Sequence, residues 1–285
     1  AILASMIQGI LVEGLVYGIM ALAVFITFRV LDFADMTVDG SFPLGAAVMA
    51  VLLTAGMNPL LAILIAFACG AAAGAVTAVI HSRLQIPGLL AGILTMTMLY
   101  SVNLRILGNR ANLSLLRVST LFNDITDLAA RFMPGEYGVP IFLALIVAAI
   151  LLLVDVFFHT DFGITLGALG SNPQLIISQG MNPEIIKGVG ICIANGLVAT
   201  AGAFASMYQG FADVGSGTGI VVSGLASVMI GEFLIRTNKI SLLTLRVVLG
   251  SIVYRMLMYF ARSYGYVINM SANDLVGQVV PSVAP

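Results

Sequence analysis

The 285-residue chain has few charged side chains: 12 Lys and Arg residues against 13 Asp and Glu residues leave a formal net charge of -1, while 60% of the residues are hydrophobic. The mean hydropathy of +1.09 lies far outside the range of soluble proteins and predicts repeated membrane spans. The balanced charge excludes a basic surface for nucleic acid, so we expect a lipid bilayer as the surroundings and no nucleic-acid partner. The predicted fold class is an all-α polytopic membrane protein.

Six apolar runs are long enough to cross about 30 Å of hydrocarbon as helices. They fall near residues 4–28, 59–80, 86–107, 139–159, 184–208 and 240–261. The first run has the length of a span and no basic segment before it, so we interpret it as a retained helix rather than a cleaved signal. For the last part of the chain, 266–285, the polar residues favour a short or incomplete helix.

Two further apolar stretches, 35–54 and 213–235, are interrupted by polar residues and glycines near their starts. Broken helices are tolerated at membrane depth only where protein or water satisfies their backbone. Both stretches are therefore predicted to be discontinuous or re-entrant, with a lipid-facing helix as the alternative for 213–235. Together with the six runs they give seven to eight transmembrane or re-entrant helices.

The long polar connection covers residues 108–138 and has room for a short amphipathic helix. Basic residues divide almost evenly between the two sides of any alternating topology, so the positive-inside rule orients the chain only weakly. We expect 108–138 to be an extracytoplasmic loop and 160–183 to lie in the cytoplasm.

The stretch 170–184, GSNPQLIISQGMNPE, separates two apolar runs. Asn is a good N-cap and Pro suits the first position of a helix, so Asn172-Pro173 is predicted to start a short helix and Asn182-Pro183 to start the next span. Gly180 is expected to end the short helix in a left-handed conformation. Such a helix is too short and too polar to cross the bilayer.

The short helix contains three consecutive apolar residues, Leu175, Ile176 and Ile177, which are unusual in a solvated loop. One interpretation is a docking element for a cytoplasmic partner, with these residues as its apolar anchor. The alternative from the residues alone is an ordinary capped loop.

Several motifs occur in a characteristic order: Gly170-x-Asn172, Gly180-Met-Asn182, Gly215-Ser-Gly-Thr-Gly219 and Gly224-Leu-Ala-Ser-Val-Met-Ile-Gly231, preceded by Asp35-Met-Thr-Val. This order and spacing resemble the permease subunits of bacterial ABC importers in the branched-chain amino acid and ribose/monosaccharide permease superfamily. The resemblance covers about residues 5–265. It implies a single transmembrane permease domain over 1–285, in a multi-pass arrangement in the bacterial cytoplasmic (inner) membrane.

The resemblance also implies partners: cytoplasmic ATP-binding-cassette ATPase subunits, an extracytoplasmic solute-binding protein and a second permease copy. A homodimer is expected, and a different permease in place of the second copy stays open. The chain has no Gly-x-x-x-x-Gly-Lys-Ser/Thr loop, so ATP and Mg are expected on the ATPase, and this chain is expected to bind no cofactor and to be no enzyme by itself.

By the same analogy, 171–180 is the coupling helix received in a groove of the ATPase. Its contact residues would be Asn172, Pro173, Gln174, Leu175, Ile176, Ile177, Gln179 and Gly180.

Polar residues inside the apolar stretches are candidates for the translocation path: Asp35, Thr37, Thr95, Thr97, Ser223, Ser227 and Arg255. An unpaired Arg at the bilayer centre costs about 3 kcal/mol, so Arg255 is predicted to pair within the bundle or to line the path. Extension of its side chain to the headgroups is the alternative. Arg246, nine residues earlier, is predicted to face elsewhere.

The expected solute is an amino acid, branched-chain or aromatic, because 236–262 looks closer to a subgroup associated with amino-acid uptake. A sugar or nucleoside is the alternative. An ion-coupled secondary transporter also stays open, because Glu13, Arg246 and Arg255 lie within apolar runs. A membrane enzyme fits least, since neither His81 nor His159 occurs in a metal-ligand spacing.

Overall fold

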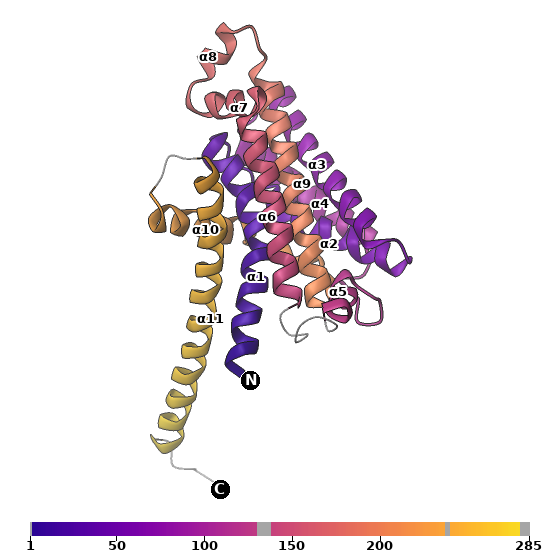
Figure 1. Cartoon of the computed structure of the whole chain (residues 1–285), viewed down its shortest axis with the longest axis vertical. Coiled ribbons are helices and arrows are strands. Elements are labelled where there is room, and N and C mark those ends of the chain that lie inside the picture. The colour runs from indigo at the N-terminus through magenta and orange to yellow at the C-terminus, as the bar shows by residue number, and fades with distance from the viewer. Residues whose placement is uncertain (1, 130–137, 237–239, 280–285) are drawn as a thin grey trace.

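The protein is a bundle of helices with a small two-stranded ribbon at one end (Figure 1). The computed structural model describes residues 2–129, 138–236 and 240–279. The helices of the first half are α1 (Ile2–Val24) with its π-helical continuation η1 (Phe25–Val30), α2 (Val38–Thr54), α3 (Pro59–Leu84), α4 (Gly88–Ile106) and α5 (Leu121–Ala129). Those of the second half are α6 (Gly138–His159), α7 (Asp161–Ser171), α8 (Pro173–Ser178), α9 (Pro183–Gln209), the 3-10 turn η3 (Val214–Gly217), α10 (Ile220–Leu234) and α11 (Ile240–Val279).

Seven helical segments within the described ranges are long and apolar enough to cross a membrane, and α2 is a shorter apolar helix beside them. All six predicted spans are confirmed, which makes the chain an all-α polytopic membrane protein. The seventh segment is Val214–Leu234, in which a break at Thr218–Gly219 separates η3 from α10. The discontinuity expected for 213–235 is therefore present, while its re-entrant character stays a prediction.

The last helix is longer than expected. Its apolar window is Leu242–Ser263, as predicted, but α11 continues to Val279. No proline occurs between Ile240 and Val279, and the next one is Pro281, so every residue of α11 has the backbone N–H that a helix uses. Beyond Ser263 the described part of the chain is helical to Val279 and holds no further candidate span.

The two ends of the bundle are distinct (Figure 1). One end, here called the α8 end, carries α7 and α8. The other, the ribbon end, carries α5 and the antiparallel pair of β1 (Asn112–Ser114) and β2 (Phe211–Asp213), in which Leu113 pairs with Ala212. The predicted loop 108–138 thus contains a strand and a short helix, and its strand is tied to the entrance of α10. The described residues do not include Arg131 or Lys239, two of the basic residues that bear on the orientation of the chain.

Small residues let helix backbones touch at several places, among them the contacts of α2 with α9 and of α10 with α11. Between α2 and α9, a Cβ at Gly45 would meet the carbonyl of Ala199, and one at Gly202 would meet the carbonyl of Phe42. Between α10 and α11, Gly231 lies against the carbonyl of Arg246, and Gly250 lies against that of Ser227. Neither pair of helices leaves room for a side chain at these points.

Candidate functional site

The short helix α8 is formed as its sequence predicts. Asn172 caps it, its Oδ1 accepting a hydrogen bond from the backbone N–H of Gln174 at 3.1 Å, and Pro173 occupies the first turn. Gly180 follows the helix with φ +75. The Oδ1 of Asn182 then accepts from the N–H of Glu184 at 2.9 Å and starts α9. The predicted starts and stop are confirmed.

The three apolar residues of α8 do not share one environment. Leu175 and Ile177 are 46% and 54% exposed, whereas Ile176 is only 1% exposed and belongs to the hydrophobic core. The expectation that Ile176 is part of an exposed anchor is therefore wrong. Three consecutive residues of a helix point in directions about 100° apart, so when α8 packs against the bundle one of them turns inward.

A polar network lies in the middle of the bundle, between α2, α3 and α9. The amide of Asn195 donates to Asp35 Oδ2 at 2.7 Å and accepts from the hydroxyl of Ser41 at 2.7 Å. The backbone N–H of Thr37 donates to Asp35 Oδ1 at 2.9 Å, and the Thr37 hydroxyl lies 2.6 Å from that of Thr77. All five side chains are fully buried. The network ties the turn before α2 to α3 and α9.

A small cavity, here called the α4 cavity, lies between α2, α4 and η3. Its volume is about 210 Å³, and its lining consists of Asp39, Gly40, Pro43, Met96, Thr97, Tyr100, Asn103, Val214 and Thr218. Asp39 accepts hydrogen bonds from the N–H groups of Gly219 at 3.0 Å and Val221 at 2.9 Å, and so caps the start of α10. Asn103 is fully buried, and its Nδ2 donates to the carbonyl of Gly40 at 3.2 Å. Its Oδ1 has no hydrogen-bond partner among the described residues.

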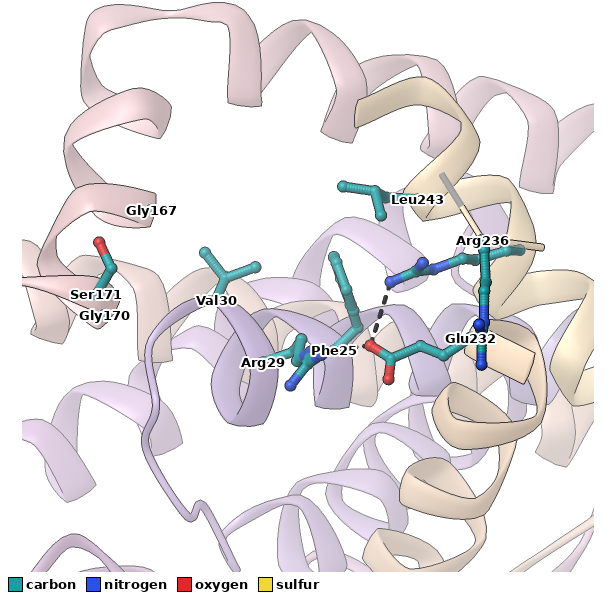
Figure 2. A pocket seen from close by; sticks show the side chains of 10 residues that line it. Phe25, Arg29, Val30, Gly167, Gly170, Ser171, Glu232, Arg236 and Leu243 are labelled. Atoms are coloured by element: carbon teal, nitrogen blue, oxygen red, sulfur yellow. Dashed lines mark hydrogen bonds and ion pairs between the residues drawn. The ribbon is translucent and has the colours of Figure 1, made fainter. Parts of the chain in front are cut away.

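A larger pocket of about 950 Å³, the basic pocket, opens at the α8 end. It is lined by Phe25, Arg29, Val30, Gly167, Gly170, Ser171, Glu232, Arg236, Leu243 and Arg246. Figure 2 shows Arg29, Glu232 and Arg236 on one side of the pocket, across from the α7 residues around Ser171. The Glu232 carboxylate pairs with Arg29 Nε at 2.8 Å and with Arg246 at 3.1 Å. One carboxylate therefore joins η1, α10 and α11.

Arg255 is held inside the bundle toward the ribbon end. Its guanidinium lies 3.8 Å from the Glu13 carboxylate and 3.5 Å from the centre of the Tyr17 ring. The prediction that Arg255 pairs within the bundle is confirmed, and Arg246 faces a different partner, Glu232, as expected.

The predicted path residues do not gather in one place. Asp35 and Thr37 lie in the buried network, and Thr97 lines the α4 cavity. The hydroxyl of Thr95 donates a hydrogen bond to the carbonyl of Ala91, and the hydroxyl of Ser227 donates one to the carbonyl of Ser223. Arg255 lies against α1, away from both.

Several polar residues that hold these sites were missed by the sequence reasoning: Ser41, Asp39, Thr77, Asn103, Asn195 and Glu232. A usable signal existed for Asn103, Asn195 and Glu232, because each is an isolated strongly polar residue in an apolar helix, where such groups are costly unless paired. Across the described residues no group of three or more His, Cys, Asp and Glu side chains is placed to hold a metal ion.

Comparison with known proteins identifies the family to which this chain belongs. Residues 6–280 match the family model described as branched-chain amino acid transport system / permease component. The chain is 42% identical over 262 residues to the tyrosine transport system permease protein of Clostridioides difficile (strain R20291), covering 92% of this chain and 84% of that protein. It is 35% identical to an uncharacterized protein, RP368, of Rickettsia prowazekii (strain Madrid E), covering 76% of this chain and 73% of that one.

A more distant relative is the ribose import permease protein RbsC of Escherichia coli (strain K12), with 28% identity over 69% of this chain and 60% of that protein. The family match spans nearly all of the described helices, including α8 and the broken segment before α10. The chain therefore belongs to the branched-chain amino acid transport system permease family and is a multi-pass membrane permease of the ABC importer type.

Proposed function

We propose that this chain forms the translocation path of an importer for an amino acid, and that a separate cytoplasmic ATPase drives it by acting on α8. The importer would lie in the bacterial inner membrane, with two ATPase subunits, an extracytoplasmic solute-binding protein and a second permease copy as partners. The observation that carries the proposal is the construction of α8, a short capped helix that presents apolar side chains at one end of a membrane bundle.

The attachment of α8 to the bundle suits it to pass a displacement, imposed by a partner, on to α9. Its inner residue, Ile176, is seated in the core, while Leu175 and Ile177 remain available to a partner. Gln179 ends α8, and Asn182, three residues later, caps the start of α9. The connection between the two helices is therefore short. A displacement of α8 would therefore reach α9 and the polar network around Asn195.

The choice of an amino acid rests on relatedness. The relative named for tyrosine is 42% identical over most of this chain, whereas the relative named for ribose is 28% identical over a smaller part. A sugar or nucleoside is the second candidate. An ion-coupled transporter is less favoured, because Arg246 and Arg255 each have a carboxylate partner, which suits a structural role.

The test is uptake of radiolabelled L-tyrosine into proteoliposomes that contain the permease with its ATPase, with the solute-binding protein outside. ATP and Mg inside, without an ion gradient, should drive uptake, and ADP should not. Uptake driven by a proton or sodium gradient in the absence of ATP would contradict the ATPase part of the proposal. ATP-driven uptake of ribose in place of tyrosine would contradict the substrate.

The proposed orientation, with α8 in the cytoplasm and η3 outside, makes a separate prediction. In a background with Cys69→Ala and Cys192→Ala, Gly215→Cys should react with a membrane-impermeant maleimide added to intact cells, because position 215 is exposed at the ribbon end. Met181→Cys, which is also exposed at the α8 end and is not among the predicted ATPase contacts, serves as the control and should react only after permeabilisation. The reverse pattern would invert the topology.

A further inference from the structure

We propose that the α4 cavity is a solute subsite that binds the ammonium group of the amino acid as it enters the translocation path. This inference rests on the proposed function and adds to it the place and the chemistry of recognition. It starts from the unpaired Oδ1 of Asn103, which is a strong acceptor in a fully buried side chain that lines the cavity. A buried polar atom without a partner is costly, so such atoms in native proteins commonly mark a site that a ligand or water completes.

The lining favours a ligand that donates hydrogen bonds. Asp39 contributes a carboxylate, and the lining contains no Lys, Arg or His. The hydroxyls of Thr97 and Thr218 already donate to backbone carbonyls, Leu94 at 2.8 Å and Gly215 at 3.1 Å, so toward a ligand they can act only as acceptors. A cavity with a negative charge and an excess of acceptors attracts a cationic donor such as an ammonium group and disfavours a carboxylate.

The position of the cavity fits entry from the ribbon end. α4 runs from Gly88 near the α8 end to Ile106 near the ribbon end, and the lining begins at Met96 and Thr97 in the middle of this helix. Asn103 lies about two turns closer to the ribbon end. The opposite wall is the broken segment at Val214 and Thr218, and broken helices at membrane depth are a recurrent way to build solute sites.

The size of the cavity restricts what it holds. About 210 Å³ is below the usual range of drug-sized ligand pockets, roughly 300–1,000 Å³, and suits the polar end of one small solute. The basic pocket at the α8 end is larger but carries three guanidinium groups against one carboxylate, which repel an ammonium group. The α4 cavity is therefore the better candidate for the ammonium subsite, both by the charge of its lining and by its position.

The experiment compares variants in the proteoliposome assay, with L-tyrosine as the probe. Asn103→Leu removes the unpaired acceptor, and Thr97→Val removes a hydroxyl on the exposed side of the same helix, where folding should be unaffected. Loss of a hydrogen bond to a charged group corresponds to about a tenfold or larger effect, so Asn103→Leu should lower kcat/KM for uptake at least about tenfold, and Thr97→Val should lower it less. Asn103→Gln, which keeps both the amide donor and an acceptor oxygen, should retain more uptake than Asn103→Leu.

The control is Ser101→Ala on the same helix, because Ser101 is exposed and does not line the cavity. Its uptake should match the wild type. A second readout is Thr97→Cys in the cysteine-free background, whose maleimide labelling should slow when tyrosine-loaded binding protein and ATP are present. If wild-type protein transports tyrosine but Asn103→Leu and Thr97→Val transport it normally, the subsite is wrong and the proposed function stands. If the intact wild-type complex transports neither tyrosine nor a branched-chain amino acid, both are wrong.

Discussion

Replacing both Leu175 and Ile177 with Ala is expected to abolish ATP-dependent uptake while the permease stays folded in the membrane. The two side chains are about half exposed, so their removal opens no cavity in the bundle. If they fill a groove of the ATPase, each truncation at the centre of that contact would cost about 2 kcal/mol or more, and the pair would weaken docking more than a hundredfold. Co-purification of the ATPase with the tagged permease measures the loss directly.

The matched control is the residue between them. Ile176→Ala removes a fully buried side chain and should destabilise the permease itself by about 2–5 kcal/mol, visible as a lower thermal unfolding temperature in detergent. Variants at three consecutive residues should thus differ in effect: the Leu175 and Ile177 double variant loses docking, whereas Ile176→Ala loses stability. Normal ATPase association and normal uptake in the outer double variant would mean that α8 is only a capped connection.

Glu232→Gln is expected to destabilise the α8 end of the bundle strongly. The Arg246 side chain is only 9% exposed, and Glu232 is its carboxylate partner at 3.1 Å. Removing one member of a buried ion pair leaves the other charge uncompensated, which typically costs about 3–5 kcal/mol. Because Glu232 is partly accessible, we expect a loss of about 3 kcal/mol, measured as a fall in the midpoint of thermal unfolding.

Arg29→Gln provides the comparison for this prediction. Arg29 binds the same carboxylate at 2.8 Å, but its side chain is 64% exposed, and exposed ion pairs contribute only about 0–1 kcal/mol. A double variant, Glu232→Gln with Arg246→Met, should recover part of the stability because no buried charge then remains. Equal losses for Glu232→Gln and Arg29→Gln would show that the burial of Arg246 is not the cause.

The parts of the fold that the sequence predicts well are those governed by short-range chemistry. The Asn-Pro pairs at 172–173 and 182–183 cap helices as expected, because an Asn cap and a first-turn Pro depend only on neighbouring residues. The spans follow from their length and hydrophobicity, which do not depend on how they pack. The continuation of α11 past Ser263 does not follow from hydrophobicity, because an apolar run marks the span and not the full length of its helix.

The parts that the sequence does not predict depend on partners far along the chain. Asp35 was singled out as a path residue, but its main side-chain partner, Asn195, is 160 residues away. The inward direction of Ile176 depends on how α8 packs, which no local pattern specifies. The α4 cavity joins Asp39, Asn103 and Thr218 from three segments, and only their common position in the fold makes them a site.

The glycine contacts described above hold two pairs of helices together as blocks, α2 with α9 and α10 with α11. α2 and α9 are locked by backbone against backbone at Gly45 and Gly202, and α10 and α11 are locked in the same way at Gly231 and Gly250. No side chain separates the backbones at these points, so each block should keep its internal packing when the bundle rearranges. The chain passes between the blocks through the turn at 214–219, where the Asp39 carboxylate of the first block holds the N–H groups of Gly219 and Val221 in the second. Asp39 thus links the two blocks by its side chain, and at the same turn a Cβ at Gly217 would meet its backbone carbonyl.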